Sequence, residues 1–141
     1  MSGELTDRVA LVTGGRRGFD EFFGFLGGAH PYFAERGAPI YRNDTVVDET
    51  EYLTDAFGRE AVAYIDRHKE HPFMLYLAFN AVHTPMQATD ARMKRFEKIT
   101  DNKRRTYAAM TSAMDDAVGQ VLEKLKSAGP MKWSKRQLAW S

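Results

Sequence analysis

A short apolar run between two helical segments most strongly limits the folds open to this chain. Residues 73–79 (Phe-Met-Leu-Tyr-Leu-Ala-Phe) are almost continuously apolar, which favours a strand buried on both faces. On either side of it, segments 52–69 and 101–127 carry apolar residues at helical spacing. Residues 9–13 are a second short apolar run, which ends in a Gly-Gly turn. We therefore predict a helix-rich α/β fold with a small parallel sheet (9–13 and 73–79) packed by two long helices.

The remaining pattern gives three further expectations. The last helix carries one apolar stripe, which should face the core: Tyr107, Met110, Met114, Ala117, Val118, Val121, Leu122 and Leu125. A short helix should begin at Thr89 or Asp90, with Met93 and Phe96 facing inward. Asn-Asp at 43–44 predicts a hairpin between 40–42 and 45–47, because these residues tolerate positive φ.

Charge and cysteine content exclude several classes of function. The 20 basic and 19 acidic residues leave a formal net charge of +1, so no strong field draws the chain to nucleic acid or to an acidic membrane. The chain has no cysteine, which excludes disulfides, thiolate metal sites and a cysteine nucleophile. Neither a signal-peptide pattern nor a membrane-spanning run is present. We expect one cytoplasmic domain over residues 1–141, with 130–141 as a basic tail.

Residues 5–18 (Leu-Thr-Asp-Arg-Val-Ala-Leu-Val-Thr-Gly-Gly-Arg-Arg-Gly) resemble the start of short-chain dehydrogenases, where a strand feeds a Gly-rich turn that cradles phosphates. Thr13, Gly14 and Gly18 match that pattern, but Asp20 stands where the last glycine should be. A carboxylate there would repel a pyrophosphate. The family's Tyr-x-x-x-Lys pair does not follow. We therefore expect no nicotinamide cofactor and interpret the segment as a core strand and turn.

Residues 18–129 resemble a type I sulfatase, of the alkaline-phosphatase-like α/β superfamily. The resemblance rests on four ordered motifs: Gly18-Phe-Asp-Glu-Phe-Phe-Gly-Phe-Leu-Gly-Gly-Ala-His-Pro-Tyr-Phe33, Tyr52-Leu-Thr-Asp55, His71-Pro-Phe-Met-Leu-Tyr-Leu-Ala-Phe-Asn-Ala-Val-His-Thr-Pro85, and Tyr107-Ala-Ala-Met-Thr-Ser-Ala-Met-Asp-Asp-Ala-Val-Gly119. It implies that His83 corresponds to the histidine that contacts the sulfate ester.

This sequence departs from the sulfatase pattern at the groups that carry the family's chemistry. The family converts a cysteine into its nucleophile, and its calcium carboxylates come from an Asp-Asp pair and a later Asp-Asn-Gly. None of these motifs is found here. With the dehydrogenase-like start, this suggests a chimera joined near Gly18. Such a fragment would expose apolar surface that its parent buries, so we expect a homodimer or higher oligomer.

The four histidines are the candidate metal ligands. His68 and His71 are spaced i, i+3 at the end of a predicted helix, which would put both rings on one face. A catalytic zinc takes three protein ligands and a water, and His83, His30, Glu70 or Asp66 could supply the third. Zinc-bound hydroxide would be the nucleophile, with a cation on the leaving oxyanion. Arg42 and Lys69 are candidates for that cation.

Each candidate also has a structural interpretation. His68 and His71 could favour the helix dipole, His30 could be a packing residue, and His83 could be an inherited residue without a role. Asp115 and Asp116 point about 100° apart on a helix, so they do not converge on one ligand. Asp20-Glu21 is interpreted as a helix N-terminal feature, and the basic run 103–105 lacks the wider basic face of a nucleic-acid site.

Two functions from different classes follow. The first is a minimal hydrolase of activated phosphate triesters or sulfate esters, dependent on a divalent metal, with zinc as the expected ion. His83 would be its catalytic residue, and His68, His71, His83 and His30 its metal ligands. The alternative is a folded, oligomeric sulfatase fragment without enzymatic activity.

Overall fold

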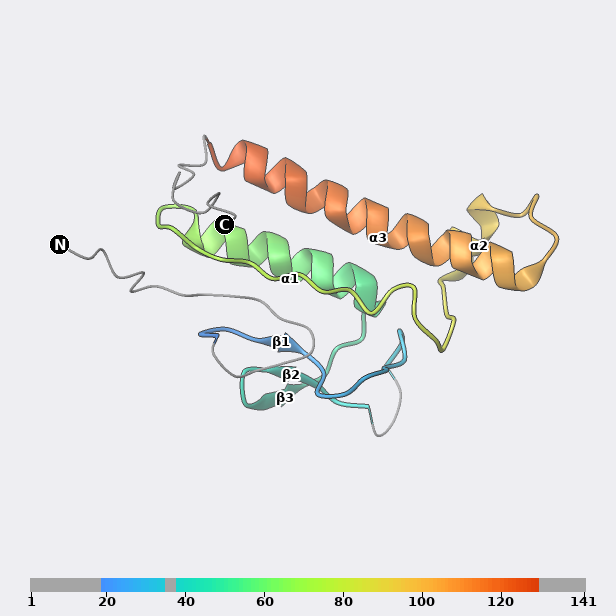
Figure 1. The fold of residues 1–141 in the computed structure, drawn as a ribbon, viewed down its shortest axis with the longest axis horizontal. Helices are drawn as coiled ribbons and strands as arrows, with labels where there is room; N and C mark the ends of the chain where they lie inside the picture. The colour runs from blue at the N-terminus through green and yellow to red at the C-terminus, as the bar shows by residue number, and fades with distance from the viewer. Residues whose placement is uncertain (1–18, 35–37, 130–141) are drawn as a thin grey trace, which may run out of the picture.

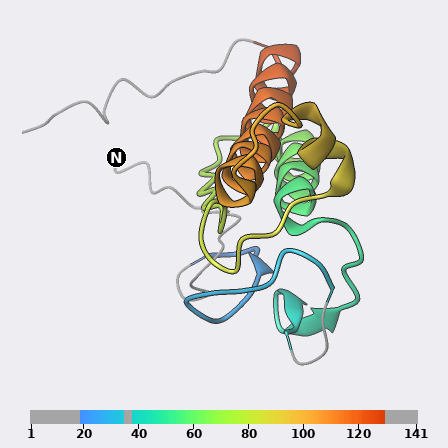
Figure 2. The ribbon, with the colours of Figure 1, turned by 90° about the vertical axis from the view of Figure 1, so that its right-hand side faces the viewer.

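The computed structural model describes residues 19–34 and 38–129, which form a small sheet, a central helix and an outer helix (Figure 1). The strands are β1 (Phe23–Gly24), β2 (Ile40–Arg42) and β3 (Thr45–Val47). The helices are α1 (Leu53–His68), α2 (Asp90–Arg95) and α3 (Asn102–Ser127). The long helix α3 lies over α1, and the sheet lies on the other side of α1 (Figures 1 and 2). The mixed α/β class is therefore confirmed.

The sheet is antiparallel, so the predicted parallel arrangement is wrong. Its strand order is β1-β2-β3, and both pairings are antiparallel. The physical reason is the tight turn after β2, where Asn43 adopts φ 52° and returns the chain directly beside itself. The Asn43 side chain accepts a hydrogen bond from the Phe22 backbone N–H at 2.9 Å, which ties the turn to β1. The predicted hairpin is confirmed. Residues 9–13 lie outside the described residues.

Residues 73–79 form an extended segment that is not assigned to the described sheet. The segment runs along α1 (Figure 1), and every second side chain packs on the core cluster: Phe73, Leu75, Leu77 and Phe79. Met74 and Tyr76, between them, are 58% and 51% exposed. The prediction of a strand buried on both faces is therefore wrong for one face. The Tyr64 hydroxyl, from α1, donates to the Met74 carbonyl at 3.3 Å.

Helices α1 and α3 run in the same direction and touch through small residues. A Cβ built on Gly58 would lie 2.9 Å from the Ala117 Cβ, so glycine is what permits this approach. Further along both helices, Asp66 pairs with Lys124. The buried residues of α3 are mostly small: Thr106, Ala109, Met110, Ala113, Ala117 and Val121.

The boundaries of the helices were predicted closely, but the predicted apolar stripe of α3 is only partly buried. Tyr107, Val118 and Leu122 are 52%, 39% and 51% exposed, so these three expected core residues face away from α1. At α2 the Thr89 hydroxyl accepts a hydrogen bond from the Arg92 N–H, which confirms the predicted start. Met93 and Phe96 are only partly buried.

A network of charges fastens the sheet to α1. Arg42, from β2, donates to both carboxylate oxygens of Glu60 at 2.8 and 2.7 Å, and Arg59 reaches the same carboxylate at 3.0 Å. Burial alone would raise the pKa of Glu60, but the hydrogen bonds from Arg42 and Arg59 outweigh it and hold the pKa below 4.5.

We expect this network to make the fold sensitive to acid. Because the pKa of Glu60 is lower in the folded state, its contribution is complete above the unfolded pKa of 4.5 and is lost as pH falls through the folded value. Glu60→Gln should cost about 1–3 kcal/mol at pH 7, and the difference should shrink as the pH falls. Urea unfolding of both proteins at pH 7 and pH 3 measures it. An equal difference at both values would contradict the assignment.

Candidate functional site

The loop 80–87, between the extended segment and α2, carries His83 and is held by a buried tyrosine. The Tyr32 side chain is completely buried, and its hydroxyl lies within hydrogen-bonding distance of the carbonyl oxygens of Asn80 (2.6 Å) and His83 (2.9 Å). The His83 N–H closes a turn onto the Asn80 carbonyl at 2.8 Å. Two cis peptide bonds, Ala81–Val82 and Thr84–Pro85, belong to the same loop.

The end of the loop at Gln87 is hydrogen-bonded to Tyr32 and to Tyr52. The Tyr32 backbone N–H donates to Gln87 Oε1 at 2.7 Å, and the Tyr52 hydroxyl donates to the Gln87 carbonyl at 2.8 Å. The rings of Tyr32 and Tyr52 stack at 5.6 Å. Burial raises the pKa of Tyr32 to about 12, so its hydroxyl keeps its proton and stays a donor at neutral pH. Both ends of the loop therefore rest on buried donors.

The His83 ring is exposed, and the structure fixes the role of one of its nitrogens. Nδ1 lies 2.7 Å from the Thr84 carbonyl oxygen, which can only accept, so Nδ1 carries a proton and donates. The other nitrogen, Nε2, is then a lone-pair acceptor in the neutral ring and an N–H donor in the imidazolium. Such a ring can bind or protonate an ester oxygen. It can also offer a lone pair to a metal.

The structure gives His68 and His71 different surroundings. His68 Nε2 lies 2.7 Å from Glu21 Oε1, and its ring packs on Tyr64 at 4.6 Å. Arg67 donates to the other oxygen of Glu21 at 2.6 Å. Burial works to raise the pKa of Glu21, but the hydrogen bonds from His68 and Arg67 lower it overall. His71 is exposed, beyond the end of α1. The predicted pair does not face a common ligand.

His30 is a buried packing residue in this structure. Nδ1 lies 2.6 Å from the Pro31 carbonyl oxygen, and Nε2 lies 3.2 Å from that of Ala38. The ring stacks on Phe25 at 4.7 Å. Both ring nitrogens therefore face main-chain carbonyl oxygens, and neither faces another of the predicted zinc ligands.

The described residues do not fit the predicted metal. Within 19–34 and 38–129, no three His, Cys, Asp or Glu side chains gather where they could hold an ion. The two predicted oxyanion cations are also engaged, since Arg42 pairs with Glu60 and Lys69 with Asp66 at 3.1 Å. Zinc binding by the four histidines stays a prediction.

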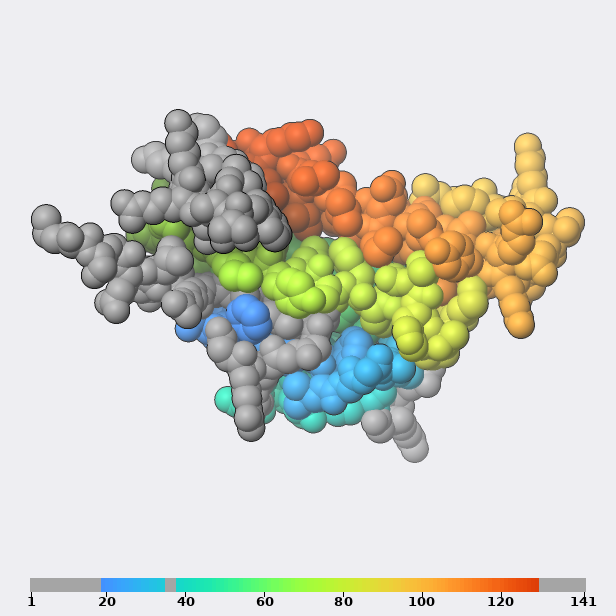
Figure 3. Space-filling model, in the orientation of Figure 1, coloured from blue at the N-terminus to red at the C-terminus, as the bar shows by residue number. Residues whose placement is uncertain are grey.

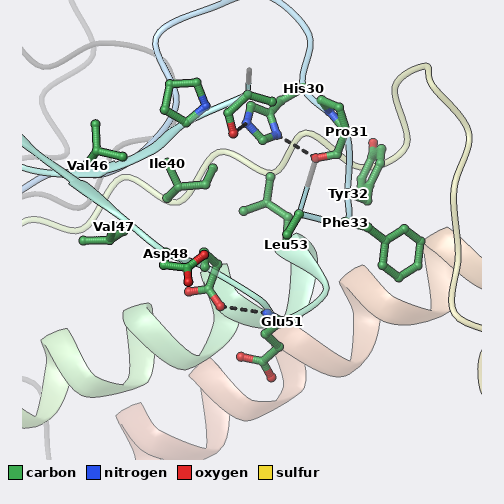
Figure 4. A pocket seen from close by; sticks show the side chains of 14 residues that line it. His30, Pro31, Tyr32, Phe33, Ile40, Val46, Val47, Asp48, Glu51 and Leu53 are labelled. Carbon is green, nitrogen blue, oxygen red and sulfur yellow. Dashed lines mark hydrogen bonds between the residues drawn. The ribbon is translucent and has the colours of Figure 1, made fainter. Parts of the chain in front are cut away.

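A hollow that the sequence did not suggest lies beside His30 (Figure 4). Its volume is about 530 Å³, with Ile40 and Leu53 among its apolar walls and Asp48 and Glu51 at one side. Arg59 pairs with Glu51, which neutralises one of the carboxylates. Carboxylates disfavour an anionic ester, and no residue of the loop 80–87 lines this hollow. The loop therefore remains the better candidate for ester chemistry.

Known structures share this fold. The crystal structure of Ps i-CgsB aligns with a TM-score of 0.76 and 38% sequence identity, over 86% of this chain and 34% of that one. The putative sulfatase yidJ from Bacteroides fragilis aligns with a TM-score of 0.69 at 15% identity, which supports the fold alone.

The fold and its relatives define a class, the sulfatase-like proteins of mixed α/β structure. The family model described as Sulfatase matches residues 6–133, so the chain belongs to the sulfatase family. It is 33% identical to arylsulfatase J of Mus musculus over 126 residues, 81% of this chain and 21% of that protein. It is 36% identical to the uncharacterized sulfatase YdeN of Escherichia coli K12, over 80% of this chain and 20% of that protein. The chain thus spans about a fifth of the length of these relatives.

The family match also bears on the predicted chimera. It begins at residue 6, within the segment that we compared with dehydrogenases, so these comparisons give a junction near Gly18 no support. The segment itself lies outside the described residues. Separately, no helix in the described part of the chain is long and apolar enough to cross a membrane.

Proposed function

We propose that the chain acts on sulfate esters and that His83 is the residue that contacts the ester. One observation carries this proposal: an exposed imidazole in the middle of a loop whose two ends are held by buried donors, with the Nδ1 proton donated to the Thr84 carbonyl. Relatives support the substrate class. The chain is 31% identical to human N-acetylgalactosamine-6-sulfatase, and one similar structure is a complex with k-i-k-neocarrahexaose. A sulfate ester on a sugar is therefore the preferred substrate.

The chemistry proposed for His83 is proton donation to the leaving group. Water attacks the sulfur, and the bond from sulfur to the ester oxygen breaks. The imidazolium Nε2–H gives its proton to that oxygen, so the alcohol leaves. The attacking water becomes an oxygen of the released sulfate and loses its proton to solvent, from which the imidazole is protonated again. Because Nδ1 stays bonded to the Thr84 carbonyl in both protonation states, the ring keeps its orientation throughout. The proposed step uses only water and the His83 ring.

The finer parts of the function remain proposals. Turnover of phosphate triesters and dependence on zinc both rest on the histidine pattern of the sequence. Self-association rests on exposed apolar side chains, of which Met74, Tyr76 and Leu122 are each more than half exposed.

The test is hydrolysis of a panel of activated aryl sulfates, phosphate monoesters and phosphate triesters by the purified chain. His83→Ala should lower kcat/KM about 10²–10⁴-fold, the usual contribution of a general acid. The matched comparison is His71→Ala, since His71 is also exposed. This variant should leave turnover unchanged if His83 is the proton donor, and should lower turnover if the four histidines hold zinc. Repeating the assay with a chelator, and then with added zinc, tests metal dependence.

Each result of this assay supports or contradicts one of the proposed functions. Equal loss in both histidine variants would contradict the role of His83. Turnover that disappears with chelator and returns with zinc would support the predicted metal. No turnover by a folded sample on any ester would favour the alternative, a folded sulfatase fragment without activity.

A further inference from the structure

Three points of the loop 80–87 converge on a single buried residue, Tyr32. The Tyr32 hydroxyl lies within hydrogen-bonding distance of the Asn80 and His83 carbonyl oxygens, and the Tyr32 backbone N–H donates to Gln87 Oε1 at 2.7 Å. In Figure 3 the yellow-green surface of the loop borders the blue surface of the segment that carries Tyr32. Because the Tyr32 ring is completely buried, its two donors keep a fixed separation. The loop is therefore fixed at its beginning, its middle and its end.

Tyr32 is itself held against α1, so it can serve as a fixed reference for the loop. Leu53, the first residue of α1, donates its N–H to the Tyr32 carbonyl at 2.8 Å. The Tyr32 ring stacks on that of Tyr52, which directly precedes α1 and is also buried. The Tyr52 hydroxyl in turn donates to the Gln87 carbonyl at 2.8 Å. Gln87 is thus bonded to both members of a buried tyrosine pair whose position α1 fixes.

Gln87 is the point of this arrangement at which the identity of a side chain matters. At Asn80 and His83 the tyrosine hydroxyl meets main-chain carbonyl oxygens, which any residue supplies. The contact with the Tyr32 N–H instead needs an acceptor on the side chain of residue 87, and the amide oxygen of Gln87 provides it. An unpaired N–H at a buried residue is costly, so loss of this acceptor favours a shift of the chain.

We propose that Gln87 is a positioning residue for the His83 ring, and its part in turnover rests on the proposed function. The Thr84 carbonyl, which accepts the Nδ1 proton of His83, lies between the two points at which Tyr32 holds residues 83 and 87. The direction of that carbonyl therefore depends on the Gln87 contact, and the ring follows the carbonyl. The same contact aims Nε2, the nitrogen that gives a proton to the ester oxygen. Gln87 acts through the backbone of the loop.

Two substitutions of similar size separate the acceptor from the bulk of the side chain. Gln87→Met lacks the acceptor, and kcat for an aryl sulfate should fall about 10- to 100-fold, because a displacement of about 1 Å is enough to lose such a factor. KM should change less, since the lost alignment matters for proton transfer in the transition state. Gln87→Glu keeps an oxygen that can accept from the Tyr32 N–H, so it should keep most of the wild-type kcat.

The ring nitrogens of His83 give a second readout, which needs no turnover. The neutral ring carries its proton on Nδ1 in this structure, and the ¹⁵N chemical shifts of the two nitrogens report which of them is protonated. Gln87→Met should shift the proton toward Nε2, and Gln87→Glu should keep it on Nδ1. The matched control is Thr89→Ala, which removes the hydroxyl that accepts the Arg92 N–H at the start of α2. This variant should lower Tm and leave both readouts unchanged.

Three results would overturn the proposal. The first is a Gln87→Met variant with wild-type kcat and wild-type nitrogen shifts. The second is an equal loss in Gln87→Glu and Gln87→Met, which would show that the acceptor is not what matters. The third is an equal loss in Thr89→Ala, which would assign the effect to stability alone.

A further variant and the wild-type chain keep the two proposals separate. If Gln87→Met does not fold, Tyr52→Phe replaces it, because it removes the hydrogen bond to the Gln87 carbonyl and should move the His83 nitrogen shifts in the same direction. Unchanged shifts in that variant would contradict the role of Gln87. Absence of turnover in the wild-type chain contradicts only the proposed hydrolysis, since the nitrogen shifts still decide whether Gln87 positions the ring.

Discussion

Gly58→Ala is expected to destabilise the protein, although alanine is the better helix former. The new methyl group would lie 2.9 Å from the Ala117 Cβ and 3.3 Å from its Cα, so the backbone of α3 has to move away. Overpacking of this kind costs about 1–3 kcal/mol, whereas the gain in helix propensity is about 1 kcal/mol. Urea unfolding should show a net loss of up to about 2 kcal/mol, and Gly58→Val should lose more.

The chain supplies its own control for this prediction. Gly119 lies in α3, and a Cβ built there meets nothing within 4 Å. Gly119→Ala should therefore stabilise the protein by about 0.5–1 kcal/mol through helix propensity alone. Ala117→Gly should restore part of the loss in Gly58→Ala, because it removes the opposing methyl group. If Gly58→Ala and Gly119→Ala changed the free energy of unfolding in the same direction, the close contact between α1 and α3 would not explain why residue 58 is glycine.

Tyr32→Phe should disturb the candidate site more than any other conservative change. The substitution keeps the buried ring and removes the hydroxyl that serves the Asn80 and His83 carbonyls. The Asn80 carbonyl keeps the His83 N–H as a donor, whereas the His83 carbonyl loses the tyrosine hydroxyl. Loss of such a hydrogen bond costs about 0.5–1.5 kcal/mol. Because the loop 80–87 then loses its anchor, the His83 amide should exchange hydrogen faster and turnover of aryl sulfate should fall. Hydrogen exchange and unfolding of the same sample measure both effects.

Tyr64→Phe is the matched control for Tyr32→Phe. Tyr64 is also completely buried, and its hydroxyl donates to Met74, outside the loop. This variant should lose stability and keep the rate of exchange at the His83 amide. Equal exchange at His83 in both variants would contradict the role given to Tyr32.

The elements that local patterns specify were predicted well. Apolar spacing located α1 and α3 to within a residue, and Asn43 gave the hairpin. The inward face of α3 was not predictable in this way. Hydrophobic patterning favours large side chains such as Leu122, but a helix pair as close as this one needs small residues such as Ala117 at the contact. Size complementarity between distant segments is not visible in the spacing of one segment.

The candidate site shows the same limit. The family resemblance pointed to His83. The residue that hydrogen-bonds to its carbonyl oxygen, Tyr32, lies 51 residues away in the chain, and no local pattern joins the two. The surroundings of His68 were hidden for a similar reason, whereas metal binding by His68 and His71 stays a prediction. In the structure, the Nε2 atom of His68 is hydrogen-bonded to Glu21, which lies 47 residues away in the chain. Long-range partners decide what a histidine can bind, and spacing alone does not reveal them.

The common direction of α1 and α3 has a consequence for how the chain reaches this structure. Two neighbouring helices that point the same way cannot be joined by a tight turn, and Asp66 and Lys124, which meet across the pair, are 58 residues apart in the chain. Closing that long loop lowers the conformational entropy of the chain, and this cost arises before the contact between the helices contributes any stability. High contact order of this kind slows folding relative to an antiparallel helical hairpin. The segment that carries His83 lies inside that loop, and its contact with Tyr32 spans 51 residues, so the candidate site also depends on long-range contacts.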